Sequence, residues 1–202
     1  MNTSVPLQSI VTLDLGAPAA EITRLAAVVR DDQLGGRTPC PDLDVAGILA
    51  HVIGLSVAFR DAAAKLDGPT TSTPPGPAVL PSDWRTELPL RLGELAQAWR
   101  EPAAWTGMSM AGGVTMPAEV TAAVANNELV VHGWDLATSI GEVCHPAEAN
   151  LAASWEMVSG TPDEPGARQG LFGPVVPVPD DAPLLDRVLG GAGRDPGWSP
   201  AR

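Results

Sequence analysis

The sequence contains no tyrosine, a single lysine (Lys65) and only two cysteines, Cys40 and Cys144, in 202 residues. Two cysteines cannot make the disulfide framework of a small secreted domain, and no Cys-x-x-Cys pair is present. Residues 1–9 carry neither the positive charge nor the long apolar core of a signal peptide. We therefore expect a reduced, cytoplasmic protein.

Basic residues are scarce as well. The chain has 12 Lys and Arg against 24 Asp and Glu, which gives a formal net charge of −12 at pH 7. Nucleic acids and anionic membranes are bound through basic patches, so this balance argues against both as partners. No apolar run is long enough to span a bilayer, and we expect no membrane partner.

Several common catalytic motifs are also missing. No Gly-rich phosphate loop precedes a helix, and no Gly-x-Ser-x-Gly elbow occurs. The sequence therefore gives no sign of a nucleotide-phosphate site or of the serine nucleophile of an α/β-hydrolase. Any chemistry must come from other residues.

The apolar residues point to a helical fold. They make up 45% of the chain, enough for one sizeable core. Apolar positions at helical spacing, bounded by Pro, Asp or Gly, predict helices over residues 18–34, 44–66, 82–99, 117–140 and, shorter, 147–158. The second of these is apolar nearly all round and should be central. We expect an all-α, up-down four-helix bundle, forming a single domain over residues 1–202.

The segments outside these helices are rich in Pro and Gly. Residues 67–83 predict a long loop, and residues 102–116 an irregular or weakly hairpin-like segment. From about residue 160 the chain keeps enough apolar side chains to pack on the bundle as a C-terminal extension, residues 160–202. In that extension, Asp181 is predicted to cap a last short helix over 183–189.

The most informative run is ELVVHGWD, from Glu128 to Asp135. It places a carboxylate and an imidazole four residues apart, and residues 128, 132 and 135 project from one face of a helix. Because a Glu or His in an apolar layer is costly without a partner, a divalent metal that binds Glu128 and His132 would explain both. The alternative is a hydrogen-bonded Glu–His pair on a solvated face.

A third metal ligand could come from His51, which stands alone in the apolar helix over 44–66. The alternative for such a lone His is a hydrogen-bonded core residue. Two imidazoles and one carboxylate would leave coordination positions open, as in catalytic zinc sites. These donors suit zinc, nickel, iron or cobalt, with zinc as the expected metal. The open position would hold water or a small thiol, which the metal would acidify into a nucleophile.

Other polar residues near this motif have more than one interpretation. Asp135 could orient a metal ligand or transfer a proton, or it could be an exposed or helix-bonded Asp. Cys144 and His145 are adjacent in a loop just after Gly141, and we interpret both as non-ligands. Cys40 is expected to be a small buried residue ahead of the second helix.

Parts of the chain resemble a known family. The ELVVHGWDLA run (128–137) resembles the second motif of the mycothiol-dependent maleylpyruvate isomerase-like family, within the DinB/YfiT-like metalloproteins. Residues 172–195 are similar to the C-terminal signature of short actinobacterial members. Leu43 stands where the family usually has Trp, and residues 67–116 match no family motif. Three short runs resemble the first motif of this family: Thr38-Pro39-Cys40, Asp44-Val45 and Leu49-Ala50-His51.

The resemblance implies a DinB-like four-helix bundle with a divalent metal, typically zinc, bound by His51, Glu128 and His132. It also implies thiol chemistry, with mycothiol as a cosubstrate in transfer or isomerisation. It further implies that an extra C-terminal α/β domain of the isomerase proper is missing from this chain.

The leading hypothesis is a metal-dependent enzyme that activates a small thiol or water against a small electrophilic metabolite. Detoxification and secondary metabolism are both open as its setting. The alternative is a non-catalytic metal- or ligand-binding bundle, in which His145 or Cys144 would close the coordination shell. Under either hypothesis, the protein could form a homodimer through an apolar helix face.

Overall fold

The computed structural model describes residues 13–74, 79–168 and 170–200. Over these ranges the chain forms helices and one small antiparallel sheet. The elements are α1 (Gly16–Ala26), η1 (Asp31–Gln33), α2 (Val45–Ala63), α3 (Pro69–Ser72), α4 (Trp84–Ala98), η2 (Pro102–Trp105), β1 (Met108–Ala111), β2 (Val114–Pro117), α5 (Ala118–Ile140), α6 (Glu148–Gly160), α7 (Pro165–Arg168) and α8 (Leu184–Gly191).

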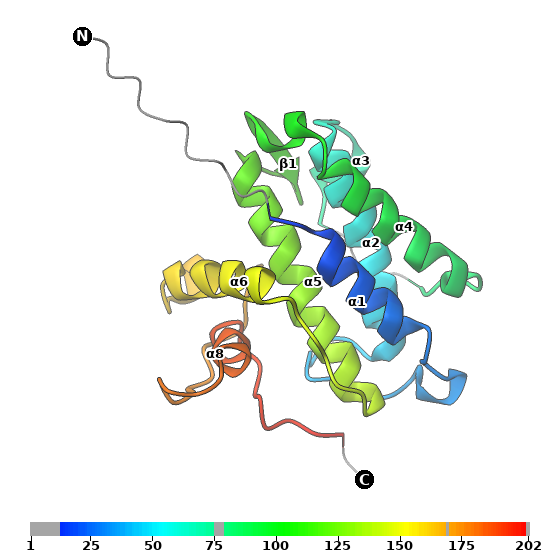
Figure 1. The fold of residues 1–202 in the computed structure, drawn as a ribbon, viewed down its shortest axis with the longest axis vertical. Coiled ribbons are helices and arrows are strands. Elements are labelled where there is room, and N and C mark those ends of the chain that lie inside the picture. The colour runs from blue at the N-terminus through cyan, green and yellow to red at the C-terminus, as the bar shows by residue number, and fades with distance from the viewer. Residues whose placement is uncertain (1–12, 75–78, 169, 201–202) are drawn as a thin grey trace.

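Four of the helices form a bundle (Figure 1). Helices α1 and α2 each pack against both α4 and α5, so α1 and α2 stand at opposite corners. Outside the bundle, α6 packs on α5 and α8 packs on α6. The all-α four-helix bundle predicted from the sequence is confirmed.

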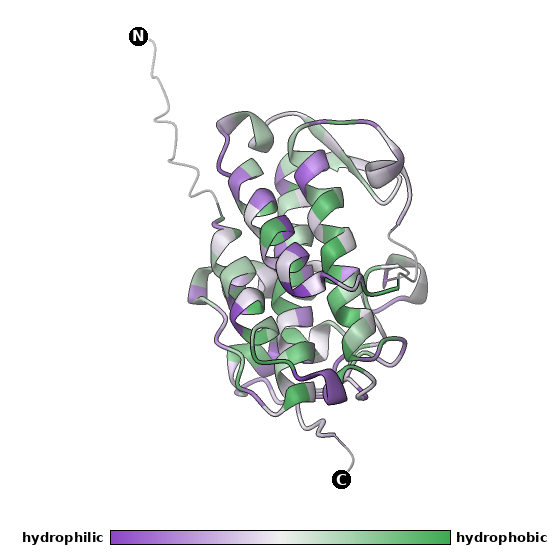
Figure 2. Ribbon diagram, turned by 90° about the vertical axis from the view of Figure 1, so that its right-hand side faces the viewer, coloured by the Kyte–Doolittle hydropathy of each residue, from purple (hydrophilic) through white to green (hydrophobic). Residues whose placement is uncertain are grey.

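Large apolar side chains from all four helices fill the centre of the bundle. Figure 2 shows hydrophobic residues running along these helices, interrupted by hydrophilic positions. Removing such side chains from water is the main favourable contribution to folding. Those that are almost fully buried include Ile22, Leu25, Ile48, Leu49, Leu88, Leu92, Leu95 and Leu136.

Helix α2 forms as predicted and begins at a side-chain cap. Asp44 accepts a hydrogen bond at 2.7 Å from the backbone N–H of Gly47, which satisfies a free donor of the first turn. Among the described helices, α2 alone is long and apolar enough to cross a membrane by length and composition. The expectation that no such run exists is therefore wrong. However, 67% of its most apolar window is buried inside the protein, which is typical of the core helix of a soluble protein.

Helix α5 follows a β-hairpin and ends at a glycine. Strands β1 and β2 pair antiparallel, with Ser109 opposite Met116, so the hairpin expected within residues 102–116 is present. Gly112 and Gly113 form its two-residue turn with φ of +58° and +80°, as a type I′ turn requires. At the other end of α5, Gly141 adopts φ of +79° and stops the helix as predicted.

The first helix is shorter than its sequence pattern predicts. It ends at Ala26, whereas the apolar pattern continues to residue 34. Beyond Ala26 the chain turns so that Val29 is buried, and the carbonyl of Leu34 then accepts a hydrogen bond from the N–H of Ala46. Tertiary contacts with α2 therefore replace the last two turns of the predicted helix.

The C-terminal extension packs on the bundle, as expected from its apolar content. Val131 of α5, Val158 of α6 and Ala192 form a small buried cluster that Phe172 covers. One sequence prediction within this extension is wrong. Helix α8 begins at Leu184 after an extended Pro183, so Asp181 lies outside its first turn and no side chain caps it.

Candidate metal centre

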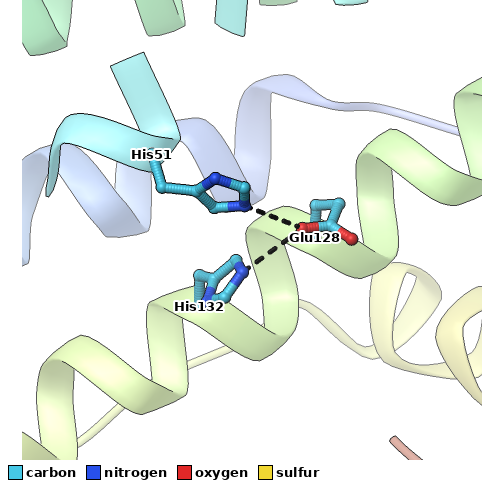
Figure 3. Close-up of side chains that lie close together, drawn as sticks. All are labelled: His51, Glu128 and His132. Carbon is cyan, nitrogen blue, oxygen red and sulfur yellow. Dashed lines mark ion pairs between the residues drawn. The ribbon is translucent and has the colours of Figure 1, made fainter. Parts of the chain in front are cut away.

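Three side chains converge between α2 and α5 (Figure 3). His51 comes from the second turn of α2, and Glu128 and His132 lie one turn apart on α5. Both imidazoles direct Nε2 at the same carboxylate oxygen, Glu128 Oε2, at 3.6 Å from His51 and 3.3 Å from His132. The lone histidine of one helix and the Glu-x-x-x-His pair of the other thus meet at one point.

The geometry of this cluster suits a metal ion. One ligand atom from each of the three residues lies within 4.8 Å of the other two. The two imidazole rings meet edge to face, with 5.0 Å between centroids and 82° between planes, so neither blocks the other. Ligand bonds of about 2.0–2.2 Å to a common ion need only small movements of these side chains. The donor set of two imidazoles and one carboxylate fits zinc or a similar divalent metal.

Within this cluster, Glu128 and His132 form an ion pair, with 3.3 Å between Glu128 Oε2 and His132 Nε2. Burial by itself raises the pKa of Glu128, but the imidazoles of His132 and His51 outweigh it and lower that pKa to about 2. Burial likewise disfavours the charged form of His132, but Asp135 and Glu128 raise its pKa to about 10. A metal ligand must be a neutral imidazole, so metal binding would displace the proton of His132.

Asp135 lies directly behind His132. Its Oδ2 is 3.0 Å from His132 Nδ1, and its side chain is completely buried. A carboxylate at Nδ1 holds the imidazole so that Nε2 faces the cluster, which is the usual support of a metal-bound histidine. Of the three interpretations of Asp135 from the sequence, this position favours orientation of a ligand over an exposed or helix-bonded Asp.

Arg194 completes this support, and the sequence analysis missed it. Its guanidinium donates from Nε to Asp135 Oδ1 at 3.0 Å and from Nη2 to Oδ2 at 3.1 Å, from a position 59 residues further along the chain. The sequence pointed to such a residue only indirectly. A carboxylate that is buried behind a histidine needs a cation to balance its charge, but the sequence does not say which one. Only the packing of the C-terminal extension identifies which cation supplies it.

The cluster lies in the wall of a cavity of about 1030 Å³. The segment before α2, one face of α2, the β-hairpin and residues 170–171 form its other walls. Cys40 also lines this cavity and is only partly buried, so the expectation of a buried residue there is wrong. The Thr38 hydroxyl accepts from the Cys40 N–H at 3.1 Å and thereby turns the chain so that Cys40 faces the cavity.

Cys144 and His145 do not join the cluster, in agreement with their interpretation as non-ligands. In the described part of the chain, His51, Glu128 and His132 form the one group of His, Cys, Asp or Glu close enough together to hold a metal. Cys144 packs near Gly133 on another face of α5, where burial raises the pKa of its thiol to about 12. The backbone N–H of His145 donates to Glu21.

Comparisons with known proteins agree with this fold. Residues 15–137 match the family model described as the mycothiol maleylpyruvate isomerase N-terminal domain. Among solved structures, the chain is similar to a crystal structure of the mycothiol-dependent maleylpyruvate isomerase, with 20% identity and a TM-score of 0.62 over 91% of this chain and 88% of that one. A histidine-to-alanine mutant of that isomerase gives 20% identity and a TM-score of 0.64 over 89% and 87%. None of the curated proteins matches this sequence.

The span of these alignments also bears on the C-terminal part of the chain. The resemblance implied that a whole domain of the isomerase is missing here, yet the similarity covers 87% of the first solved chain. A missing domain would leave a larger part of that chain unmatched, so this expectation does not agree with the comparison. The matched family model includes all three residues of the cluster and more than half of the chain. The chain therefore belongs to the mycothiol maleylpyruvate isomerase N-terminal domain family.

Proposed function

We propose that this protein is a divalent-metal-dependent enzyme that uses a small thiol, such as mycothiol, to isomerise or conjugate a small electrophilic metabolite. The observation that carries this proposal is the convergence of His51, Glu128 and His132 on one point in the wall of a large cavity. Zinc is the metal we expect, because it accepts both imidazole and carboxylate ligands in catalytic sites with an open position.

The residues around the cluster have separate roles in this proposal. A divalent metal, when bound, would lower the pKa of a thiol or water at its open position and so supply a nucleophile near neutral pH. His51, Glu128 and His132 would hold the ion. Asp135 is a positioning residue, because it touches His132 and Arg194 and is shielded from the cavity by them. Its complete burial argues against proton exchange with a substrate.

The cavity suits a reaction of two molecules. Its volume of about 1030 Å³ is at the upper end of the range for small-molecule sites. A thiolate that adds to one carbon of a conjugated C=C bond forms an S–C bond and converts that double bond to a single bond. Rotation about the single bond and expulsion of the thiolate then return the other geometric isomer and the unchanged thiol. If a proton from the thiol is instead delivered to the neighbouring carbon, the product is the thiol conjugate.

Metal content tests this proposal first. Elemental analysis of the purified protein, after reconstitution with zinc, should find about one metal ion per chain. Treatment with a chelator should abolish thiol-dependent turnover of an electrophile, and added zinc should restore it. Turnover that survives complete removal of the metal would contradict the proposal. A protein that takes up no metal would instead favour the non-catalytic ligand-binding bundle.

A further inference from the structure

The cavity extends along α2 in both directions from the cluster of His51, Glu128 and His132. Five of the residues of α2 and its cap that line it are spaced three or four apart, on one face of the helix: Asp44, Gly47, His51, Leu55 and Phe59. At 1.5 Å per residue, this row is about 22 Å long, and His51 lies near its middle. The cavity therefore has two ends, one toward the start of α2 and one toward its C-terminal half.

The end near the start of α2 is polar and charged. It is lined by the segment that precedes α2, including Arg37, Asp42 and the thiol of Cys40. Arg194 also lines the cavity, and its guanidinium donates to Asp135. This end offers donors, acceptors and charges of both signs, as a hydrophilic thiol would need.

The opposite end is apolar. Leu55, Ala58 and Phe59 of α2 form one side, and Val124 of α5 faces them. The hairpin covers this end with Val114 and Met116, which project from the same face of β2 because they are two residues apart. No charged residue lines this end in the described part of the chain.

We propose that the electrophile of this enzyme is apolar and uncharged, and that it occupies this end of the cavity. The class that fits is an α,β-unsaturated ketone or similar electrophile that carries an alkyl or aryl group. A carboxylate placed among these side chains would lose its hydration without gaining a cationic partner. The proposal rests on the proposed function, and it separates this protein from an isomerase of maleylpyruvate, which is a dicarboxylate.

A binding measurement without added thiol tests this proposal, since thiol-dependent turnover cannot then occur. The probes are 4-phenylbut-3-en-2-one and its ring para-carboxylate, titrated by calorimetry into the zinc-loaded protein and into the metal-free protein. We expect the uncharged ketone to bind at least about tenfold more tightly than the carboxylate in both forms, because desolvation of the carboxylate is not compensated. Metal and thiol binding are measured separately, so failure of the metal proposal does not affect this comparison.

The hairpin provides a variant and its matched control. Met116→Lys should place a cation at the apolar end, weaken binding of the ketone about tenfold and improve binding of the carboxylate. Met108→Lys is the control, because Met108 is exposed on the same hairpin and does not line the cavity. If Met116→Lys fails to fold, Val114→Lys replaces it, since Val114 is 58% exposed and also lines the cavity.

The proposal of an apolar electrophile is supported if the wild-type protein prefers the ketone, and if Met116→Lys or Val114→Lys reduces this preference. Met108→Lys should leave the preference unchanged. Equal or tighter binding of the carboxylate to the wild-type protein overturns the proposal. It is also overturned if neither probe binds, or if the lysine variants at the apolar end behave as the control does.

Discussion

Replacement of His132 by alanine is expected to abolish both stoichiometric metal binding and thiol-dependent activity. In the proposed site His132 supplies one of three ligand atoms, and its Nε2 lies 3.3 Å from the carboxylate oxygen that both histidines approach. Loss of a direct ligand should weaken metal binding by more than the ~10–100-fold that loss of an outer hydrogen-bond partner costs. His51→Ala should have the same effect, because it removes the one ligand from α2 and leaves only the two ligands on α5. Elemental analysis after gel filtration measures the loss.

The third histidine of the chain provides a matched control. His145 is outside the cluster, and it donates to Glu21 from its backbone N–H. His145→Ala should therefore keep the full metal content and activity. Circular dichroism of each variant checks that the bundle is intact. A His132→Ala protein that folds and still holds about one metal per chain would place the ion elsewhere.

Asp135→Ala is expected to lower the free energy of unfolding by about 3–5 kcal/mol, because it removes one partner of a buried ion pair. The side chain of Asp135 is fully buried and that of Arg194 is 11% exposed, so the guanidinium would be left without its hydrogen bonds to Asp135. The same change should weaken metal binding by roughly 10–100-fold, since His132 would lose the carboxylate that orients it. Chemical denaturation and metal titration measure the two effects.

An exposed ion pair and a double variant serve as controls. Asp31 pairs with Arg85 at 2.6 Å, but its side chain is 85% exposed, so Asp31→Ala should change stability very little. The double variant Asp135→Ala/Arg194→Met should recover part of the stability lost in Asp135→Ala, because no unpaired charge remains buried. If Asp135→Ala costs no more than Asp31→Ala, the buried pair does not support the site as we describe.

The fold was predictable because local and long-range preferences agree in the four bundle helices. Asp44 marks the start of α2 in the sequence, and Gly141 marks the end of α5. In the folded protein, α2 begins and α5 ends at these same residues. The predictions were wrong where a distant part of the chain decides the local structure. The first helix ends at Ala26 because residues 34–36 bond to the start of α2. Such contacts leave no periodic signal in a single sequence.

The candidate site divides in the same way. Spacing along α5 placed Glu128, His132 and Asp135 on one face, and the structure brings His51 to them from α2. Whether these residues bind a metal remains a prediction. Arg194 could not be assigned from the sequence, because it reaches Asp135 only through the folded C-terminal extension. The two ends of the cavity could not be predicted from the sequence either, since they combine residues from α2, α5 and the hairpin.

The central claim is that His51, Glu128 and His132 hold a metal ion with a position open to a thiol. The most direct test is the visible and near-ultraviolet spectrum of the protein loaded with cobalt(II), a spectroscopic substitute for zinc, before and after addition of N-acetylcysteine. We predict d–d bands of a site with low coordination number, and a new sulfur-to-cobalt charge-transfer band when the thiol is added. A cobalt-loaded protein whose spectrum does not respond to the thiol, or a protein that binds no cobalt, would contradict the account.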